Sequence, residues 1–160
     1  MLPQKSIDYR NQALSTWRFK VGMLMKLPSV FWWGISIRSL NEESCEVTIP
    51  YSWRTQNPFK SIYFAALNGA GELSTGALCQ MYIAGLGSYS MLVTQFRSEF
   101  YKKATTKVTF SCSQGRKVHE VLSSLQSGSF STLELESVGK NTNGEVVARI
   151  FVTWSFKKRD

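Results

Sequence analysis

Apolar residues near the start of the chain recur at the three- and four-residue spacing of an amphipathic helix. The pattern predicts a helix over residues 6–26, with Ser6 as its cap and Pro28 beyond its end. The apolar positions of this helix are Leu14, Trp17, Val21 and Leu24. We expect this apolar face to pack on the rest of the domain.

Two short runs of alternating apolar and polar residues come next. The apolar positions are Ile35 and Ile37 in the first run, and Cys45, Val47 and Ile49 in the second. The turn-forming residues 41–44 separate the runs. Alternation on both sides of a short turn predicts a β-hairpin.

The most apolar segment of the chain follows Asn57 and Pro58 and predicts a long helix over about residues 59–84. The segment is rich in small residues, is apolar on nearly every side and carries one carboxylate, Glu72. A helix that is apolar all round must be buried all round. A carboxylate is almost never fully buried without a partner or a task.

The rest of the chain alternates like strands, with one short amphipathic helix inserted at residues 116–126. Strand-like runs carry Leu92 to Arg97, Lys107 to Cys112, Leu133 with Leu135, and Ile150 to Phe156. Asn143-Gly144 stands before the last run and predicts a tight hairpin. Strands on both sides of one buried helix predict an α+β fold, in which a curved antiparallel sheet wraps around the helix. A length of 160 residues suits a single domain over residues 1–160.

The net charge of +8 suits an anionic partner such as nucleic acid, an anionic membrane or coenzyme A. The basic residues are scattered, and the aromatic residues have core spacing and are not interleaved with them. A nucleic-acid-binding module is therefore the weakest function class. No apolar run reads as a membrane span and no signal sequence is recognised, so we expect a cytoplasmic protein without a membrane partner.

Cysteine and histidine usage predicts neither a disulfide framework nor a metal site. Cys45, Cys79 and Cys112 are widely spaced and odd in number, and we expect them to be small buried hydrophobic residues. His119 is the only histidine and is expected at the surface. No metal and no cofactor is expected.

Residues 57–72 resemble the central helix of the hotdog-fold thioesterase-like superfamily. The shared features are Asn57, the run from Tyr63 to Leu67, and Glu72. The resemblance is to a domain-of-unknown-function branch related to the phenylacetyl-CoA thioesterase-like proteins. It extends to the Lys102-Lys103 turn, the inserted helix, the hairpin before Ala148 and the closing Trp154. It implies a hotdog fold, to which the helical spacing of residues 6–26 adds an N-terminal helix. A hotdog sheet has exposed edge strands, so we expect a homodimer or higher oligomer that pairs them.

The resemblance implies thioester hydrolysis with acyl-CoA or an acyl carrier as the partner. Glu72 is then the catalytic general base, and the backbone amides of Phe64 and Ala65 stabilise the oxyanion. The catalytic relatives commonly carry His-Gly-Gly where this chain has Tyr63-Phe64-Ala65. Binding of an acyl or other apolar ligand without turnover therefore stays open as the second function. Each assignment also has a structural alternative. Glu72 is then a buried acid with an internal partner, and the amides of Phe64 and Ala65 are ordinary first-turn amides.

Further polar residues are candidates for substrate binding. By resemblance Asn57 lies near the acyl group, although it also suits a helix cap. Tyr63 could orient a carbonyl group or could simply pack. Asn68, Ser74 and Thr75 share the helix with Glu72 and form either a substrate-binding patch or a set of mutually bonded core residues. Lys102 and Lys103 are candidates for the phosphates of coenzyme A, with solvated turn lysines as the alternative.

Overall fold

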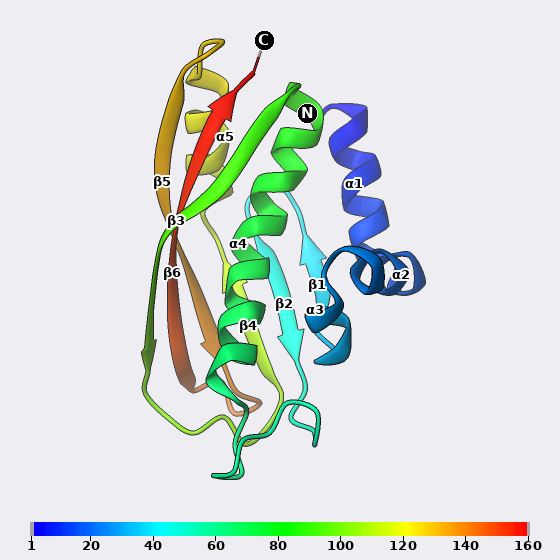
Figure 1. Cartoon of the computed structure of the whole chain (residues 1–160), viewed down its shortest axis with the longest axis vertical. Coiled ribbons are helices and arrows are strands. Elements are labelled where there is room, and N and C mark those ends of the chain that lie inside the picture. The colour runs from blue at the N-terminus through cyan, green and yellow to red at the C-terminus, as the bar shows by residue number, and fades with distance from the viewer. Residues whose placement is uncertain (1, 160) are drawn as a thin grey trace.

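The computed structural model describes residues 2–159 as helices packed on one antiparallel sheet (Figure 1). In chain order the elements are α1 (Gln4–Leu14), α2 (Thr16–Lys26), α3 (Pro28–Trp32), β1 (Ser36–Leu40), β2 (Cys45–Ile49), α4 (Phe64–Leu86), β3 (Tyr89–Phe100), β4 (Val108–Cys112), α5 (Gly115–Ser124), β5 (Phe130–Lys140) and β6 (Val146–Lys158). None of the helices within residues 2–159 has the length and apolarity needed to cross a membrane.

The sheet has six strands in the order β1-β2-β4-β5-β6-β3, and every neighbouring pair is antiparallel. Figure 1 shows α4 lying against one face of the sheet and roughly along the strands, with α1, α2 and α3 beside it near β1. This confirms the predicted architecture of a sheet that curves around one central helix. The edges of the sheet are β1 and the twelve-residue β3.

Small residues let α4 approach the sheet closely. A methyl group added at Gly71 would lie 2.5 Å from Cγ1 of Ile150 on β6. Ala66, Ala70 and Ala77 of the same helix are also buried. The core is completed from the sheet by large apolar side chains such as Phe110 and Phe156, which are fully buried. The small side chains of α4 are therefore what the close helix–sheet contact requires.

Two glycine-to-alanine substitutions should have opposite effects. Gly71→Ala should lower the free energy of unfolding by roughly 1–3 kcal/mol, because the new methyl group overlaps Ile150. Gly22→Ala in α2 meets nothing within 4 Å and should raise it by up to about 1 kcal/mol, because alanine favours helices. Urea unfolding of both variants measures this. Equal effects would show that α4 does not pack as tightly as described.

The predicted helix over residues 6–26 is two helices, and its packing was predicted wrongly. The backbone is extended at Ser15, where α1 ends and α2 begins. Trp17, Val21 and Leu24 are 66%, 50% and 53% exposed, whereas Phe19 is the buried residue of α2. Helical spacing identified an apolar face correctly, but it does not determine which surface covers that face.

The central helix begins at Phe64, five residues later than predicted. Residues 55–62 form a loop held by backbone bonds, in which the N–H of Ile62 donates to the carbonyl of Ala104 (2.8 Å) and that of Tyr63 donates to Thr55 (2.7 Å). Lys60 has a positive φ of 59°. These bonds fix the path of the chain into α4.

Candidate functional site

One stripe of α4 is only partly covered by the rest of the chain. Ala65, Asn68 and Glu72 are half-buried on a helix that is otherwise mostly buried, and their spacing puts them on one face. At the two ends of this stripe α4 touches the edge strand β3. The ring of Phe64 lies 6.4 Å from that of Phe100, and Gln80 donates a hydrogen bond to the sulfur of Met91 (2.9 Å). The stripe therefore runs beside the free edge of the sheet.

Glu72 lies in the middle of this stripe without a partner. Among the side chains of residues 2–159, none donates a hydrogen bond to its carboxylate or pairs with it ionically. Burial raises the pKa of Glu72 above its ordinary value. Gly76 stands one turn further on, where a methyl group would come within 3.2 Å of Glu72 Oε1. A carboxyl group with a raised pKa and an unused hydrogen-bonding capacity is typical of a functional site.

Asn68, one turn before Glu72, carries a second unused polar group. Its Oδ1 atom is buried and finds no hydrogen-bond donor within the described part of the chain. Buried side-chain oxygens without a partner are rare in folded proteins and call for a ligand, a water molecule or a function. Asn68 and Glu72 thus form a polar pair that the chain itself does not satisfy.

Ser74 and Thr75 are buried, and their hydroxyl groups have internal partners. Ser74 donates to the carbonyl of Gly71 (2.8 Å) and shares a hydrogen bond with Ser137 of β5 (2.7 Å). Thr75 donates to the carbonyl of Glu72 (2.8 Å) and accepts a hydrogen bond from the indole of Trp154 (2.9 Å). Both residues fix α4 to the sheet, and neither hydroxyl group points to the open stripe.

The start of α4 offers two free backbone donors. The first backbone bonds of the helix run from Ala66 and Leu67 to the carbonyl of Tyr63 (3.0 and 3.1 Å). The N–H groups of Phe64 and Ala65 have no acceptor among residues 2–159. They lie at the positive end of the helix dipole, which suits a developing negative charge.

Asn57 and Tyr63 flank this helix start in different ways. The Asn57 side chain accepts hydrogen bonds from the N–H groups of Phe59 (3.0 Å) and Ser61 (3.2 Å), so it shapes the loop. The alternative role of Asn57 as the helix cap is wrong, because Tyr63 occupies that position. Tyr63 is exposed and packs edge-on against Phe64, with ring centroids 4.9 Å apart.

The two lysines of the β3–β4 turn differ in their surroundings. Lys102 pairs with Glu145 and holds the pKa of that carboxyl group below its ordinary value, mainly through the hydrogen bond. Lys103 is exposed, and no acidic side chain of the described residues pairs with it. Lys103 is therefore the freer of the two for an anionic ligand.

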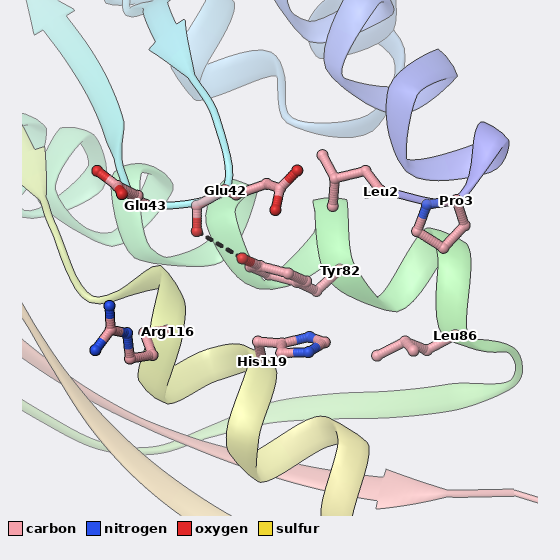
Figure 2. Close-up of a pocket in the computed structure, with 8 residues that line it drawn as sticks. All are labelled: Leu2, Pro3, Glu42, Glu43, Tyr82, Leu86, Arg116 and His119. Carbon is pink, nitrogen blue, oxygen red and sulfur yellow. Dashed lines mark hydrogen bonds between the residues drawn. The ribbon is translucent and has the colours of Figure 1, made fainter.

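A separate hollow lies toward the other end of α4 (Figure 2). It has a volume of about 380 Å³ and is lined by Leu2, Pro3, Glu42, Glu43, Tyr82, Leu86, Arg116 and His119. The Tyr82 hydroxyl donates to the carbonyl of Glu42 (2.5 Å), and the ring of His119 lies 5.4 Å from that of Tyr82. His119 is exposed, as predicted. Within residues 2–159, no group of three His, Cys, Asp or Glu side chains could hold a metal ion.

Solved structures with the same fold include several thioesterases. Protein PA5026 of Pseudomonas aeruginosa, a protein of unknown function and probable thioesterase, is 17% identical with a TM-score of 0.75, over 98% of this chain and 97% of that chain. Thioesterase HI1161 of Haemophilus influenzae is 15% identical with a TM-score of 0.66, over 86% and 88%. A Chlorobaculum tepidum protein of unknown function is 12% identical with a TM-score of 0.76, over 89% and 93%.

These similarities establish a thioesterase-like hotdog fold. The sequence identities are too low to show a shared activity or substrate. No curated protein matches the chain. The sequence profile of one family, described as Domain of unknown function (DUF4442), matches residues 15–156 and so covers most of the chain. The chain therefore belongs to the DUF4442 family.

Proposed function

We propose that this protein hydrolyses acyl thioesters of coenzyme A or of an acyl carrier, with Glu72 as the general base. The observation that carries the proposal is the unpaired Glu72 carboxyl group, which has a raised pKa and lies on the open stripe of α4. Glu72 takes a proton from water, and the resulting hydroxide attacks the thioester carbonyl carbon. The carbon–sulfur bond of the tetrahedral intermediate then breaks, and the leaving thiolate takes the proton held by Glu72, which restores the base.

The remaining polar groups of the stripe have supporting roles in this proposal. The N–H groups of Phe64 and Ala65 donate to the developing oxyanion. The Oδ1 atom of Asn68 accepts a hydrogen bond from the attacking water and orients it toward the carbonyl carbon. Tyr63 and the loop shaped by Asn57 border the acyl group. Ser74 and Thr75 position the helix through their bonds to Ser137 and Trp154.

One copy of the chain does not hold all of these groups close enough together. Ala65 and Glu72 are seven residues apart on α4, which separates them by about 10 Å along the helix axis. A single thioester must lie about 3 Å from both the oxyanion donors and the activated water. We therefore place each site between two copies, with the amides of one copy facing Glu72 of the other.

The edge strand β3 is the surface through which we propose that the two copies pair. It is long and free on one side, and it exposes Leu92, Phe96 and Phe100. An unpaired, apolar sheet edge of this length is a liability for an isolated chain, and a second copy removes it. The exposed Phe64 contacts Phe100, which brings the start of α4 to the same edge.

A second function, ligand binding without turnover, is supported by Phe64. This side chain is exposed beside the free amides, where the catalytic relatives commonly carry glycine. A bulky ring at this point restricts how a carbonyl group reaches the two donors. The protein would then hold an acyl or other apolar ligand without hydrolysing its thioester.

Incubation with a panel of acyl-CoA thioesters distinguishes the two functions. Release of free thiol, in proportion to protein and with saturation, supports hydrolysis. Saturable binding of the thioester in equilibrium dialysis, with no thiol released, supports the ligand-binding function. Neither binding nor release across short, long and aromatic acyl groups would refute both for coenzyme A, and acyl-carrier thioesters then repeat the test.

The lysines of the β3–β4 turn should contribute modestly to coenzyme A binding. The double variant Lys102→Ala with Lys103→Ala should raise KM for an acyl-CoA about two- to fivefold at low salt, because exposed point charges contribute little. Glu145→Gln should have the opposite effect, because it frees Lys102. Lys117→Ala with Lys157→Ala is the matched control, because both are exposed lysines elsewhere on the chain. A double variant with unchanged KM would leave both lysines as solvated turn residues.

A further inference from the structure

The apolar face of α2, which the domain leaves uncovered, lies on a helix that packs against α3, where Trp32 is also exposed. The large exposed side chains of this surface are Trp17, Val21, Leu24, Met25, Trp32 and Trp53. The rings of Trp32 and Trp53 meet edge to face, 5.8 Å apart, so α3 and the loop after β2 are continuous at this point. We call this surface the tryptophan ridge. Large exposed apolar side chains gathered on neighbouring elements mark an interaction site.

A hollow lined by basic residues lies beside the tryptophan ridge. It measures about 450 Å³, and its charged lining residues are Lys20, Arg38, Arg54 and Lys107. No acidic side chain lines it, and none of the four cations pairs with a carboxylate among residues 2–159. Arg54 also lies over the ring of Trp32, 5.8 Å from its centroid, and so joins the hollow to the ridge.

The surrounding sequence strengthens this positive charge. Residues 9–41 contain no aspartate or glutamate, and their basic residues are Arg10, Arg18, Lys20, Lys26 and Arg38. Arg18 lies over the ring of Trp17, 5.5 Å from its centroid. The helix that exposes the ridge is thus flanked by cations only. A helix with an apolar face, exposed tryptophan and basic flanks is typical of proteins that lie in the membrane interface.

We propose that the tryptophan ridge and the basic hollow bind the surface of an anionic phospholipid bilayer. The exposed apolar side chains enter the interface between headgroups and acyl chains, where tryptophan is favoured. The four cations of the hollow contact the phosphate and carboxylate groups of the lipid headgroups. This departs from the expectation that the protein has no membrane partner, which rested on the lack of a spanning segment and on the scattered basic residues. It holds whether or not the protein hydrolyses thioesters.

Each of the other possible binding partners would match either the basic hollow or the tryptophan ridge, but not both. A free phosphate or coenzyme A would match the hollow and leave the tryptophan ridge exposed. A second copy of the chain would cover the ridge but would bring two positively charged surfaces together, each on a chain of net charge +8. An anionic bilayer complements both parts at once.

Vesicle co-sedimentation of the full chain tests the proposal. The protein should pellet with vesicles of phosphatidylcholine mixed with phosphatidylserine, and should stay in the supernatant with phosphatidylcholine alone. Binding should fall as salt is added, because salt screens charges at the bilayer surface. Tryptophan emission should shift to shorter wavelength on binding, as ridge side chains leave water.

Two variants with matched controls locate the surface. Lys20→Gln with Arg54→Gln and Lys107→Gln should weaken binding about a hundredfold, because each basic residue near an anionic surface contributes roughly fivefold. The control, Lys117→Gln with Lys140→Gln and Lys157→Gln, removes the same charge elsewhere and should weaken it much less. Trp17→Ser should weaken binding about tenfold or more, whereas Phe130→Ser should not. The two side chains are similarly exposed, at 66% and 71%.

Several results would overturn the proposal. Equal pelleting with neutral and anionic vesicles, or no pelleting with either, would exclude recognition of an anionic bilayer. Equal loss from the two triple variants would show that only net charge matters. A change in molecular mass on Trp17→Ser, measured by light scattering without vesicles, would assign the ridge to a second copy. Weaker acyl-CoA binding in the basic-hollow variant, together with unchanged vesicle binding, would assign the hollow to coenzyme A.

Discussion

Glu72→Gln is expected to lower the rate of thioester hydrolysis by about two to four orders of magnitude, the usual contribution of a positioned general base. The amide keeps the size and shape of the carboxyl group but cannot take a proton from water. Initial rates of thiol release from the best acyl-CoA measure the effect. Glu134→Gln, an exposed substitution of the same kind on β5, is the control and should leave the rate unchanged.

The same variant should not lose stability near neutral pH. The pKa of Glu72 is raised in the folded chain, so folding favours the protonated form, and the associated stability is lost as pH rises through the folded-state pKa. Near neutral pH the wild type carries this cost and the glutamine variant does not. Its melting temperature should therefore be equal or higher, with the difference shrinking toward about pH 4, where glutamate is protonated even when unfolded. A lower melting temperature near neutral pH, with unchanged activity per folded chain, would make Glu72 a structural residue.

Phe96→Lys with Phe100→Lys should convert a dimer into monomers. Both side chains are exposed on the edge strand β3, and burial of each phenylalanine at an interface contributes about 1.5–3 kcal/mol. Their loss should raise the dimer dissociation constant at least about a hundredfold. Light scattering should give twice the 18.1 kDa chain mass for the wild type and the single mass for the variant. Hydrolysis should fall with the dimer fraction.

Subunit mixing tests whether one site uses two copies. Phe64→Pro removes one oxyanion donor at the first helical position, where proline is well tolerated and where the preceding Tyr63 is extended. Glu72→Gln removes the base. After unfolding and refolding together, mixed dimers hold one intact site, and about a quarter of wild-type activity should return for random two-fold pairing. No recovery, with both variants dimeric, would place each site within one chain. For the Phe96→Lys with Phe100→Lys variant of the sheet edge, Phe130→Lys is the control for the loss of an exposed phenylalanine.

The alternation of apolar residues predicted the sheet well because a strand with one buried face has a two-residue period. Val108, Phe110 and Cys112 are buried as that period requires. The all-round apolar pattern likewise predicted α4 as the buried centre. The start of α4 was not predictable from periodicity. The Asn57 side chain binds the loop backbone and does not cap a helix. The loop is also held by a bond from Ile62 to Ala104, which is distant in sequence.

The candidate site was predictable only along the helix itself. Helical spacing placed Asn68 and Glu72 together, because residues four apart share a face. The same spacing could not show that Ser74 and Thr75 bond to Ser137 and Trp154, which come from distant strands. Lys20, Arg38, Arg54 and Lys107 are also distant from one another in sequence, so the basic hollow exists only in the folded chain.

The buried cysteines determine which thiols contribute to the signal when hydrolysis by this protein is followed with a thiol reagent. Cys45, Cys79 and Cys112 are fully buried, and burial raises the pKa of Cys112 to about 11. Only the thiolate attacks a thiol reagent, so the buried cysteines of the folded chain give no signal. The early signal therefore comes from released coenzyme A alone. A chain that unfolds during the measurement exposes three further thiols, which adds a late, substrate-independent step of fixed amplitude. One recording therefore separates turnover from inactivation without a second probe.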